Sequence, residues 1–266
     1  MRIFVLVKQV PGTSKVEVDR ETGVLKRDGV VAKINPYDLF AIEAAVRIRE
    51  KLGAGTTVTA ISMGPPQAER SLREALAMGV DEAVLVSDRR FGGADVLATS
   101  RTLSQAIRAA GEPDLILCGL QTTDGDTGQV GPEVSEMLGI PHMASVAGIE
   151  EVDWKGITVT TDLPDSIETV HLPYPCLLAV NKDLNTPRLP SYRRLLKTRD
   201  QKIRVITLDD LADKDPSHYG LHGSATRVVR IFPPEHHIDH EEWTGTTEEL
   251  SHRLADYLAD AKFLIK

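Results

Sequence analysis

Short apolar runs alternate with helix-like segments through the first half of this chain. The runs cover residues 3–7, 58–63, 83–86 and 115–120. Asn35-Pro36 is a good helix start, because asparagine can cap a helix and proline fits its first position. This helix should end near Gly53, a second should run from Pro65-Pro66 to about Gly79, and a third should carry residues 97–107. The pattern predicts an α/β fold, with a mostly parallel sheet covered by helices on both faces.

The second half has a different pattern. Residues 156–161 and 167–171 alternate polar and apolar side chains, which predicts antiparallel strands added to the sheet. Residues 176–180 are apolar throughout and predict one more buried strand. From about residue 212 the sequence turns polar, as in Asp213–Gly220, and reads as a linker. We therefore expect a main α/β domain over residues 1–211, followed by a linker and C-terminal arm over residues 212–266.

The C-terminal arm should end in an amphipathic helix. Its apolar positions fall on one face, and they are Leu250, Leu254, Tyr257, Leu258 and Ala261. That face has to be buried, either against a partner subunit or by folding back onto the chain's own domain.

Charge and composition exclude several classes of protein. A formal net charge of −8 argues against nucleic acid or an anionic membrane as the main partner. The two cysteines, Cys118 and Cys176, lie in apolar strand-like runs and are interpreted as buried structural thiols. The N-terminal run is too short for a signal peptide core, and no stretch approaches the length of a membrane span. We expect a cytoplasmic protein.

The loop after the fourth apolar run is the strongest sign of a ligand site. Residues 124–132 read D-G-D-T-G-Q-V-G-P, and a helix is expected to begin near Gln129. Glycines let backbone N–H groups approach a ligand, and a helix N-terminus carries partial positive charge. A phosphate-bearing ligand is one interpretation, and a tight turn without a ligand is the other. The spacing matches neither G-x-G-x-x-G nor G-x-x-x-x-G-K-[ST].

Residues 236–240 read H-H-I-D-H, and the spacing of two histidines one helical turn apart would suit a metal. Two prolines precede this segment, its surroundings are acidic and polar, and H-E-x-x-H is absent. A solvated linker is therefore the favoured interpretation, and metal-dependent hydrolysis the lesser one.

From Val5 to about Phe232, the chain resembles the beta subunit of the electron transfer flavoproteins. The matching stretches are V-L-V-K-Q-V-P from Val5, 31–38, 62–66, 74–79, 119–121 with the loop that follows, and 184–188. The resemblance implies a sheet of the adenine-nucleotide-binding type and an alpha subunit that holds one FAD. It also implies an adenine nucleotide in the beta subunit, which is AMP in one branch and a second FAD in the other.

The D-G-D-T loop followed closely by Q-V-G-P resembles the second, bifurcating branch. In that branch the beta FAD takes a hydride from NADH, and the electron pair is split between a high-potential and a low-potential acceptor. A short loop with Gly125 and Gly128 would leave room for the diphosphate of FAD, which must pass over it. The partners implied are the alpha subunit, a dehydrogenase or quinone oxidoreductase, and ferredoxin or flavodoxin. An AMP-holding structural subunit, or a nucleotide sensor without redox chemistry, is the alternative.

The resemblance also implies which residues contact the cofactor. Leu6 and Lys8 would lie near the adenosine, Asn35 and Asp38 near the ribose or phosphates, and Met63 at the adenine. The phosphate loop would supply the rest, with Thr127 and Gln129 as side-chain donors. The loop contacts implied are Gly119, Gln121, Asp124, Gly125, Asp126, Thr127, Gly128, Gln129 and Val130. Without the resemblance, Asn35 reads as a plain helix cap and Met63 as core.

Two stretches depart from the AMP branch. Residues 11–14 lack the aromatic residue of that branch, and Tyr192 stands where a leucine is usual. These departures weaken the expectation of docking to the acyl-CoA dehydrogenases usual for that branch.

A strongly basic segment follows Pro187. From Arg188 to Arg204 it holds seven basic residues against the single acid Asp200. Such a local reversal of charge predicts a docking surface for a redox partner or for the alpha subunit, and a solvated helix is the lesser alternative.

Overall fold

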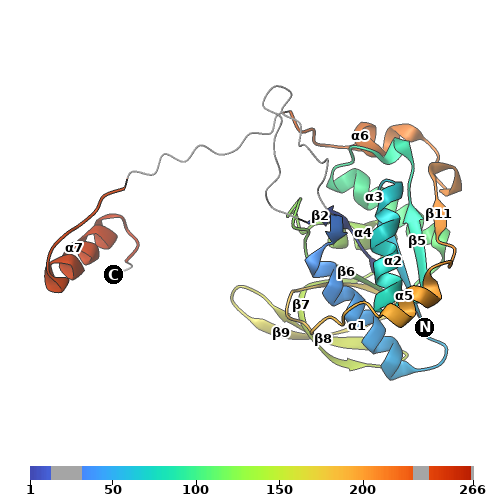
Figure 1. Ribbon diagram of the computed structural model, residues 1–266, viewed down its shortest axis with the longest axis horizontal. Helices are drawn as coiled ribbons and strands as arrows, with labels where there is room; N and C mark the ends of the chain where they lie inside the picture. The colour runs from blue at the N-terminus through green and yellow to red at the C-terminus, as the bar shows by residue number, and fades with distance from the viewer. Residues whose placement is uncertain (13–31, 230–239, 265–266) are drawn as a thin grey trace. The chain divides into compact units, whose positions relative to one another are not determined.

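The structure is a computed structural model of the 266-residue chain and describes residues 1–12, 32–229 and 240–264. The chain divides into two compact units, residues 1–229 and residues 230–266 (Figure 1). Among the described residues, no helix is long and apolar enough to cross a membrane.

The first unit is built from eleven strands and six α-helices in the described ranges. The strands are β1 (Arg2–Leu6), β2 (Gln9–Pro11), β3 (Ala32–Ile34), β4 (Thr57–Met63), β5 (Glu82–Val86), β6 (Leu115–Gly119), β7 (His142–Val152), β8 (Gly156–Asp162), β9 (Ile167–Pro173), β10 (Cys176–Val180) and β11 (Arg204–Ile206). The helices are α1 (Pro36–Leu52), α2 (Glu69–Met78), α3 (Val96–Ala110), α4 (Val130–Leu138), α5 (Tyr192–Thr198) and α6 (Gly220–Gly223).

Nine strands form one mostly parallel sheet in the order β11-β5-β4-β1-β6-β10-β7-β8-β9. Every pairing from β11 to β7 is parallel, while β8 pairs antiparallel with both β7 and β9. The strands β2 and β3 form a separate antiparallel pair. The predicted parallel sheet with antiparallel additions is confirmed.

The two faces of the sheet belong to two hydrophobic clusters. Ile3 and Val5 of β1 belong to a buried cluster that includes apolar residues of α1 and α2. Phe4 of β1 belongs to a second cluster, which includes Leu103 of α3 and Val134 of α4. Because successive strand side chains point to opposite faces, an all-apolar strand needs helices on both sides. The expected covering of both faces is confirmed.

The element bounds follow local sequence signals. Asn35 stands just before α1, Pro36 opens the helix and Gly53 ends it, as the sequence predicts. The expected helix at Pro65-Pro66 begins instead as a short 3-10 turn over Pro66–Ala68, and α2 starts at Glu69. The strands β7 and β11 were not expected, because β7 has mixed polarity and β11 is short. The helix α5 lies in the basic segment, for which a solvated helix was the alternative interpretation.

Residues 213–223 pack against the rest of the first unit, although their composition predicts a linker. Tyr219 is fully buried and its ring lies 5.6 Å from that of Phe91. The tyrosine hydroxyl donates to the Asp213 carbonyl at 2.7 Å, and Asp215 caps the short turn that follows it. The polar residues here satisfy backbone groups of the turn, while one aromatic side chain anchors the segment.

The second unit holds the helix α7 (Thr247–Asp260), which starts with a capping box of Thr246 and Glu249. Trp243 packs edge-on against Tyr257 with 5.7 Å between ring centroids, and the Arg253 guanidinium lies 4.4 Å from the centre of the Trp243 ring. The predicted terminal helix is present. Within this unit Leu254 is about half exposed. Burial of the apolar face of α7, either against a partner subunit or against the chain's own domain, stays a prediction.

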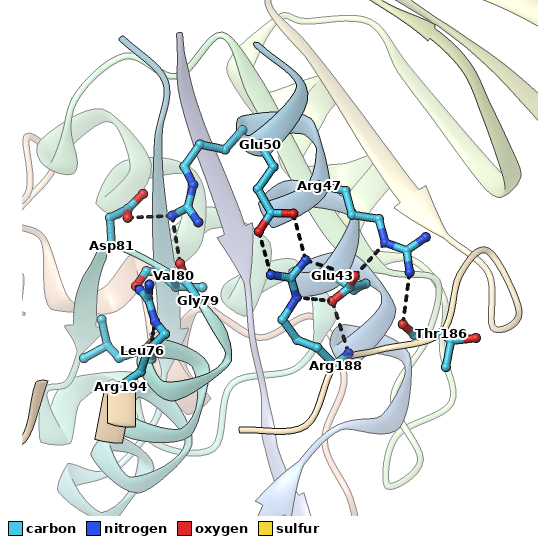
Figure 2. Close-up of polar contacts among 11 residues, drawn as sticks. Glu43, Arg47, Glu50, Leu76, Gly79, Val80, Asp81, Thr186, Arg188 and Arg194 are labelled. Carbon is cyan, nitrogen blue, oxygen red and sulfur yellow. Dashed lines mark hydrogen bonds and ion pairs between the residues drawn. The ribbon is translucent and has the colours of Figure 1, made fainter. Parts of the chain in front are cut away.

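The chain between β10 and β11 is held across α1 and α2 by arginines (Figure 2). Arg188 donates to the Glu43 carboxylate at 2.7 Å and to Glu50 at 2.7 Å and 3.0 Å. The Glu43 side chain is only 3% exposed and also accepts from Arg47 at 2.6 Å. Burial alone would raise the pKa of Glu43, but hydrogen bonds from Arg188 and Arg47 hold it below its usual value. This carboxylate fastens the segment to α1.

We predict that Arg188→Met lowers the free energy of unfolding by about 2–3 kcal/mol, because it leaves a buried carboxylate short of donors. The control Glu50→Gln, at a carboxylate that is half exposed, should cost less than about 1 kcal/mol. Urea unfolding measures both variants. Equal losses would contradict the assigned role of Glu43.

The ion pair of Glu43 and Arg188 should make the free energy of unfolding depend on pH. The pKa of Glu43 is lower in the folded state than its ordinary value of 4.5. The ionised carboxylate therefore stabilises the fold fully above pH 4.5, and this stabilisation is lost as the pH falls through the folded-state pKa. Glu43→Gln should therefore reduce the dependence of stability on pH in the acidic range.

Candidate nucleotide-binding cleft

A cleft of about 1030 Å³ lies at the carboxyl ends of the central parallel strands. Residues at the ends of β1, β4, β5 and β6 line it, together with the loops that lead into α2, α3 and α4. The chain moves from β1 to β4 on one side and returns to β6 on the other side. Ligands of open α/β sheets bind at such a switch in strand order.

The glycine loop forms one wall of this cleft. Gly125, Thr127 and Gly128 line it, and Gly128 has a φ of 65°, a conformation that favours glycine. Asp126 also has a positive φ of 53°, and its N–H donates to the Thr122 carbonyl at 2.8 Å. The N–H groups of Gly125, Thr127, Gly128 and Gln129 meet no acceptor among the described residues. They are therefore free to bind an anion at the start of α4.

Asp38 joins the ends of two strands beneath the cleft. One carboxylate oxygen accepts from the Lys8 N–H at 2.7 Å, and the other accepts from the Gly119 N–H at 3.2 Å and the Asn35 amide at 3.0 Å. Burial raises the pKa of Asp38 to about 7, while these hydrogen bonds favour the carboxylate. A side chain at Gly119 would come within 2.5 Å of Asp38, so only glycine fits there.

Asn35 connects the start of α1 to the chain that leads into the glycine loop. Its amide donates to the Gln121 carbonyl at 2.9 Å and accepts from the Thr123 N–H at 3.2 Å. The expected cap is present by position only, since the Asn35 side chain makes no capping hydrogen bond. Asn35 is fully buried and serves the loop instead of the helix end.

Lys8 is the cation nearest the loop in this wall. Its ammonium group lies 2.7 Å from the Asp124 carboxylate and 3.5 Å from the Thr122 hydroxyl. Burial opposes ionisation of Asp124, but the bond from Lys8 holds its pKa below the usual range. Both side chains are partly exposed, so Lys8 can exchange this partner for a phosphate at small cost.

The structure brings most of the predicted contacts together at one cleft. The predicted residues that line it are Leu6, Lys8, Asp38, Met63, Gly119, Gln121, Gly125, Thr127, Gly128, Gln129 and Val130. Asn35, Asp124 and Asp126 do not line it and act through the loop or through Lys8. Whether these residues bind a cofactor stays a prediction.

The opposite wall of the cleft was not predicted. It comes from the loop between β5 and α3, including Arg89 and Phe91–Val96, and from Thr226 and Val228. Asp95 caps α3 through the Ala98 N–H at 3.0 Å and accepts from the Thr226 N–H at 2.8 Å. Gly92-Gly93 between a strand and a helix is the same kind of signal as the other glycine loop and could have indicated this wall.

The sequence also singled out two cysteines and a histidine segment. Cys118 and Cys176 are buried and unpaired, as expected, and burial raises the pKa of both thiols. The histidine segment lies outside the described residues except for His240. Among the residues that the structure describes, no group of three potential metal ligands is found.

Comparison with known proteins identifies the family. The electron transfer flavoprotein domain matches residues 22–211. The electron transfer flavoprotein subunit beta of Thermoanaerobacterium thermosaccharolyticum is 44% identical over 259 residues, which cover 97% of this chain and 98% of that protein.

Two further relatives carry names that refer to reductases. The caffeyl-CoA reductase-Etf complex subunit CarD of Acetobacterium woodii is 43% identical, with 93% of each chain covered. The acryloyl-CoA reductase electron transfer subunit gamma of Anaerotignum propionicum is 39% identical, with 97% of this chain and 98% of that protein covered. The chain therefore belongs to the electron transfer flavoprotein family, as a beta subunit that functions in electron transfer.

Proposed function

We propose that this beta subunit holds FAD in the cleft and accepts a hydride from NADH for electron bifurcation. The observation that carries the proposal is a large cleft whose glycine loop presents N–H groups that have no acceptor among the described residues. Beta subunits of this family work with an alpha subunit and with redox enzymes. The heterodimer with the alpha subunit is therefore the unit to test.

The size of the cleft favours FAD over AMP. Small-molecule sites usually enclose about 300–1,000 Å³. At about 1030 Å³ this cleft lies just above that range, and its volume is larger than a mononucleotide needs. The N–H groups of Gly125, Thr127 and Gly128, which meet no acceptor within residues 1–12, 32–229 and 240–264, would suit the diphosphate of a dinucleotide.

The protein groups would bind and orient the cofactor. Lys8 would turn from Asp124 to a phosphate, and the glycine loop would receive the rest of the diphosphate through its N–H groups. Asp38 and Asn35 would keep the loop in place through their buried hydrogen bonds. When bound, FAD would supply the hydride acceptance and the one-electron steps that protein side chains cannot perform.

We further propose that α5 carries the docking face for a redox partner. This docking face consists of Tyr192, Arg193, Leu196 and Lys197, all of them exposed. Exposed apolar side chains beside cations are typical of a transient interface with an acidic partner. Two relatives are named for CoA-ester reductases, so a reductase or dehydrogenase of that class is the first partner to test.

Only some cations of the predicted basic segment are available for docking. Three arginines are engaged within this chain. Arg188 donates to Glu43 and Glu50, Arg194 donates to backbone carbonyls at the end of α2, and Arg204 donates to the Ala109 carbonyl. These three side chains hold the segment in place. Within the described part of the chain, the side chains of Arg193, Lys197, Arg199 and Lys202 make no hydrogen bond or ion pair. Of these four cations, Arg193 and Lys197 lie on α5 and belong to the docking face.

We predict that the purified heterodimer contains two FAD and that Gly128→Val removes about one of them. A branched residue at a φ of 65° is strained by about 1–3 kcal/mol, and its side chain would stand at the cleft wall. Gly53→Val is the matched control, because Gly53 also has a positive φ but meets no atom near its Cβ position. Acid release and chromatography count the nucleotides. One FAD and one AMP in the wild-type heterodimer would refute FAD binding in this cleft.

We predict that NADH reduces the flavin held by this subunit without any acyl-CoA. Anaerobic mixing should bleach flavin absorbance rapidly in the wild-type heterodimer and far less in Gly128→Val. A heterodimer that holds both flavins and stays yellow with NADH would rule out the bifurcating assignment.

We predict that Arg193→Glu with Lys197→Glu raises the KM for the redox partner about tenfold, equivalent to ~1.4 kcal/mol. The dependence of the rate on salt should flatten, because opposite charges no longer attract. Arg70→Glu, at an exposed position of α2 outside the docking face, is the control. Unchanged KM and salt slope in an intact heterodimer would exclude α5 as the docking site.

A further inference from the structure

Two arginines, Arg73 and Arg194, join α2 and α5, and each donates to carbonyls at the carboxyl end of the other helix. We call this pair of arginines the clasp. Arg194 of α5 donates to the Leu76 carbonyl at 3.1 Å and to the Val80 carbonyl at 2.9 Å, at the end of α2 (Figure 2). Arg73 of α2 donates to the carbonyls of Thr198, Arg199 and Gln201, at the end of α5, at 2.9–3.1 Å. Each helix therefore supplies the cation that caps the carboxyl end of the other.

The clasp matches the groups that a helix end leaves unpaired. The last carbonyls of a helix have no partner within it, and they carry partial negative charge. A guanidinium group bears several donors in a fixed plane and can serve more than one carbonyl at once. Glu69 accepts from Arg73 at 2.8 Å and 3.1 Å, which fixes the direction of that side chain.

Backbone and amide contacts complete the attachment at both ends of α5. The Ser191 N–H donates to the Ala77 carbonyl at 2.9 Å, just before α5 begins. The Gln201 amide donates to the Asp81 carbonyl at 2.7 Å, just after it ends. With 7 residues, α5 is too short to be stable by itself, so these contacts to α2 set its position.

We propose that Arg73 and Arg194 are positioning residues for electron transfer, which hold α5 ready to receive the redox partner. The proposal rests on the docking face proposed above. Neither arginine has to touch the partner, since each is engaged with carbonyls of this chain. A preformed surface avoids the cost of ordering a loop during association. The clasp should therefore strengthen binding of the partner and have little effect on the rate of electron transfer within the bound complex.

The test uses the flavin-loaded heterodimer with Arg73→Met, Arg194→Met and the conservative Arg73→Lys. We expect Arg73→Met and Arg194→Met to raise the KM for the redox partner about tenfold with kcat nearly unchanged, which corresponds to ~1.4 kcal/mol. Arg73→Lys should recover part of the loss, because an ammonium group can still donate to one or two carbonyls. Reduction by NADH alone should proceed at the wild-type rate, since it needs no partner.

Arg70→Met is the matched control, because it removes the same charge from an exposed position of the same helix. A fall in melting temperature without a rise in KM would show that the clasp is only structural and would overturn the proposal. Equal KM increases for Arg70→Met would attribute the effect to net charge and would overturn it as well.

Tyr192→Ala and Arg193→Glu separate this proposal from the docking face. If both raise KM while the clasp variants do not, the docking face stands and the positioning role fails. If neither raises KM, the docking face itself is wrong.

Discussion

The buried carboxyl group of Asp38 is the interaction on which the cleft depends. It stands in the first turn of α1 and accepts hydrogen bonds from the amides that follow β1 and end β6. These two strands are neighbours in the sheet, and different loops follow them. The part-buried Lys8 and Gly119 amides would lose this acceptor if Asp38 were apolar. The requirement extends to Gly119, because a Cβ atom there would displace Asp38.

Most polar side chains near the cleft are therefore engaged in building it. Asp38 and Asn35 are buried and hold strand ends and the loop, and Asp95 holds both α3 and Thr226. What remains for a ligand is mainly backbone N–H groups, one lysine whose bond to Asp124 is exchangeable, and apolar walls. Such a surface would suit the proposed nucleotide in shape and charge, and it would leave the redox chemistry to the bound group.

The sequence was most informative where one local signal decides the structure. Apolar runs predicted the central strands, and Asn35, Gly53 and Gly79 marked the helix ends within a residue. Eleven of the fourteen predicted contacts line one cleft, although Asn35 lies beneath it, tied to Gln121 far along the chain. That tie, and the opposite wall at Thr226, depend on long-range packing that no local pattern encodes. Tyr219 likewise fixes a polar segment, because burial of one aromatic ring outweighs the composition around it.

The basic segment shows that the sequence alone also does not predict which charged side chains stay available for binding. A run of arginines predicts a positive surface, but a guanidinium group beside a helix end or a buried carboxylate is consumed by that contact. Arg188 meets Glu43, and Arg194 meets the end of α2, because the segment crosses these two helices. Holding the segment with cations leaves its apolar residues without a role in the core, and Tyr192 and Leu196 stay exposed. A short helix fixed by polar contacts on its inner side can thus present apolar and basic side chains outward, which a helix fixed by its apolar face could not do.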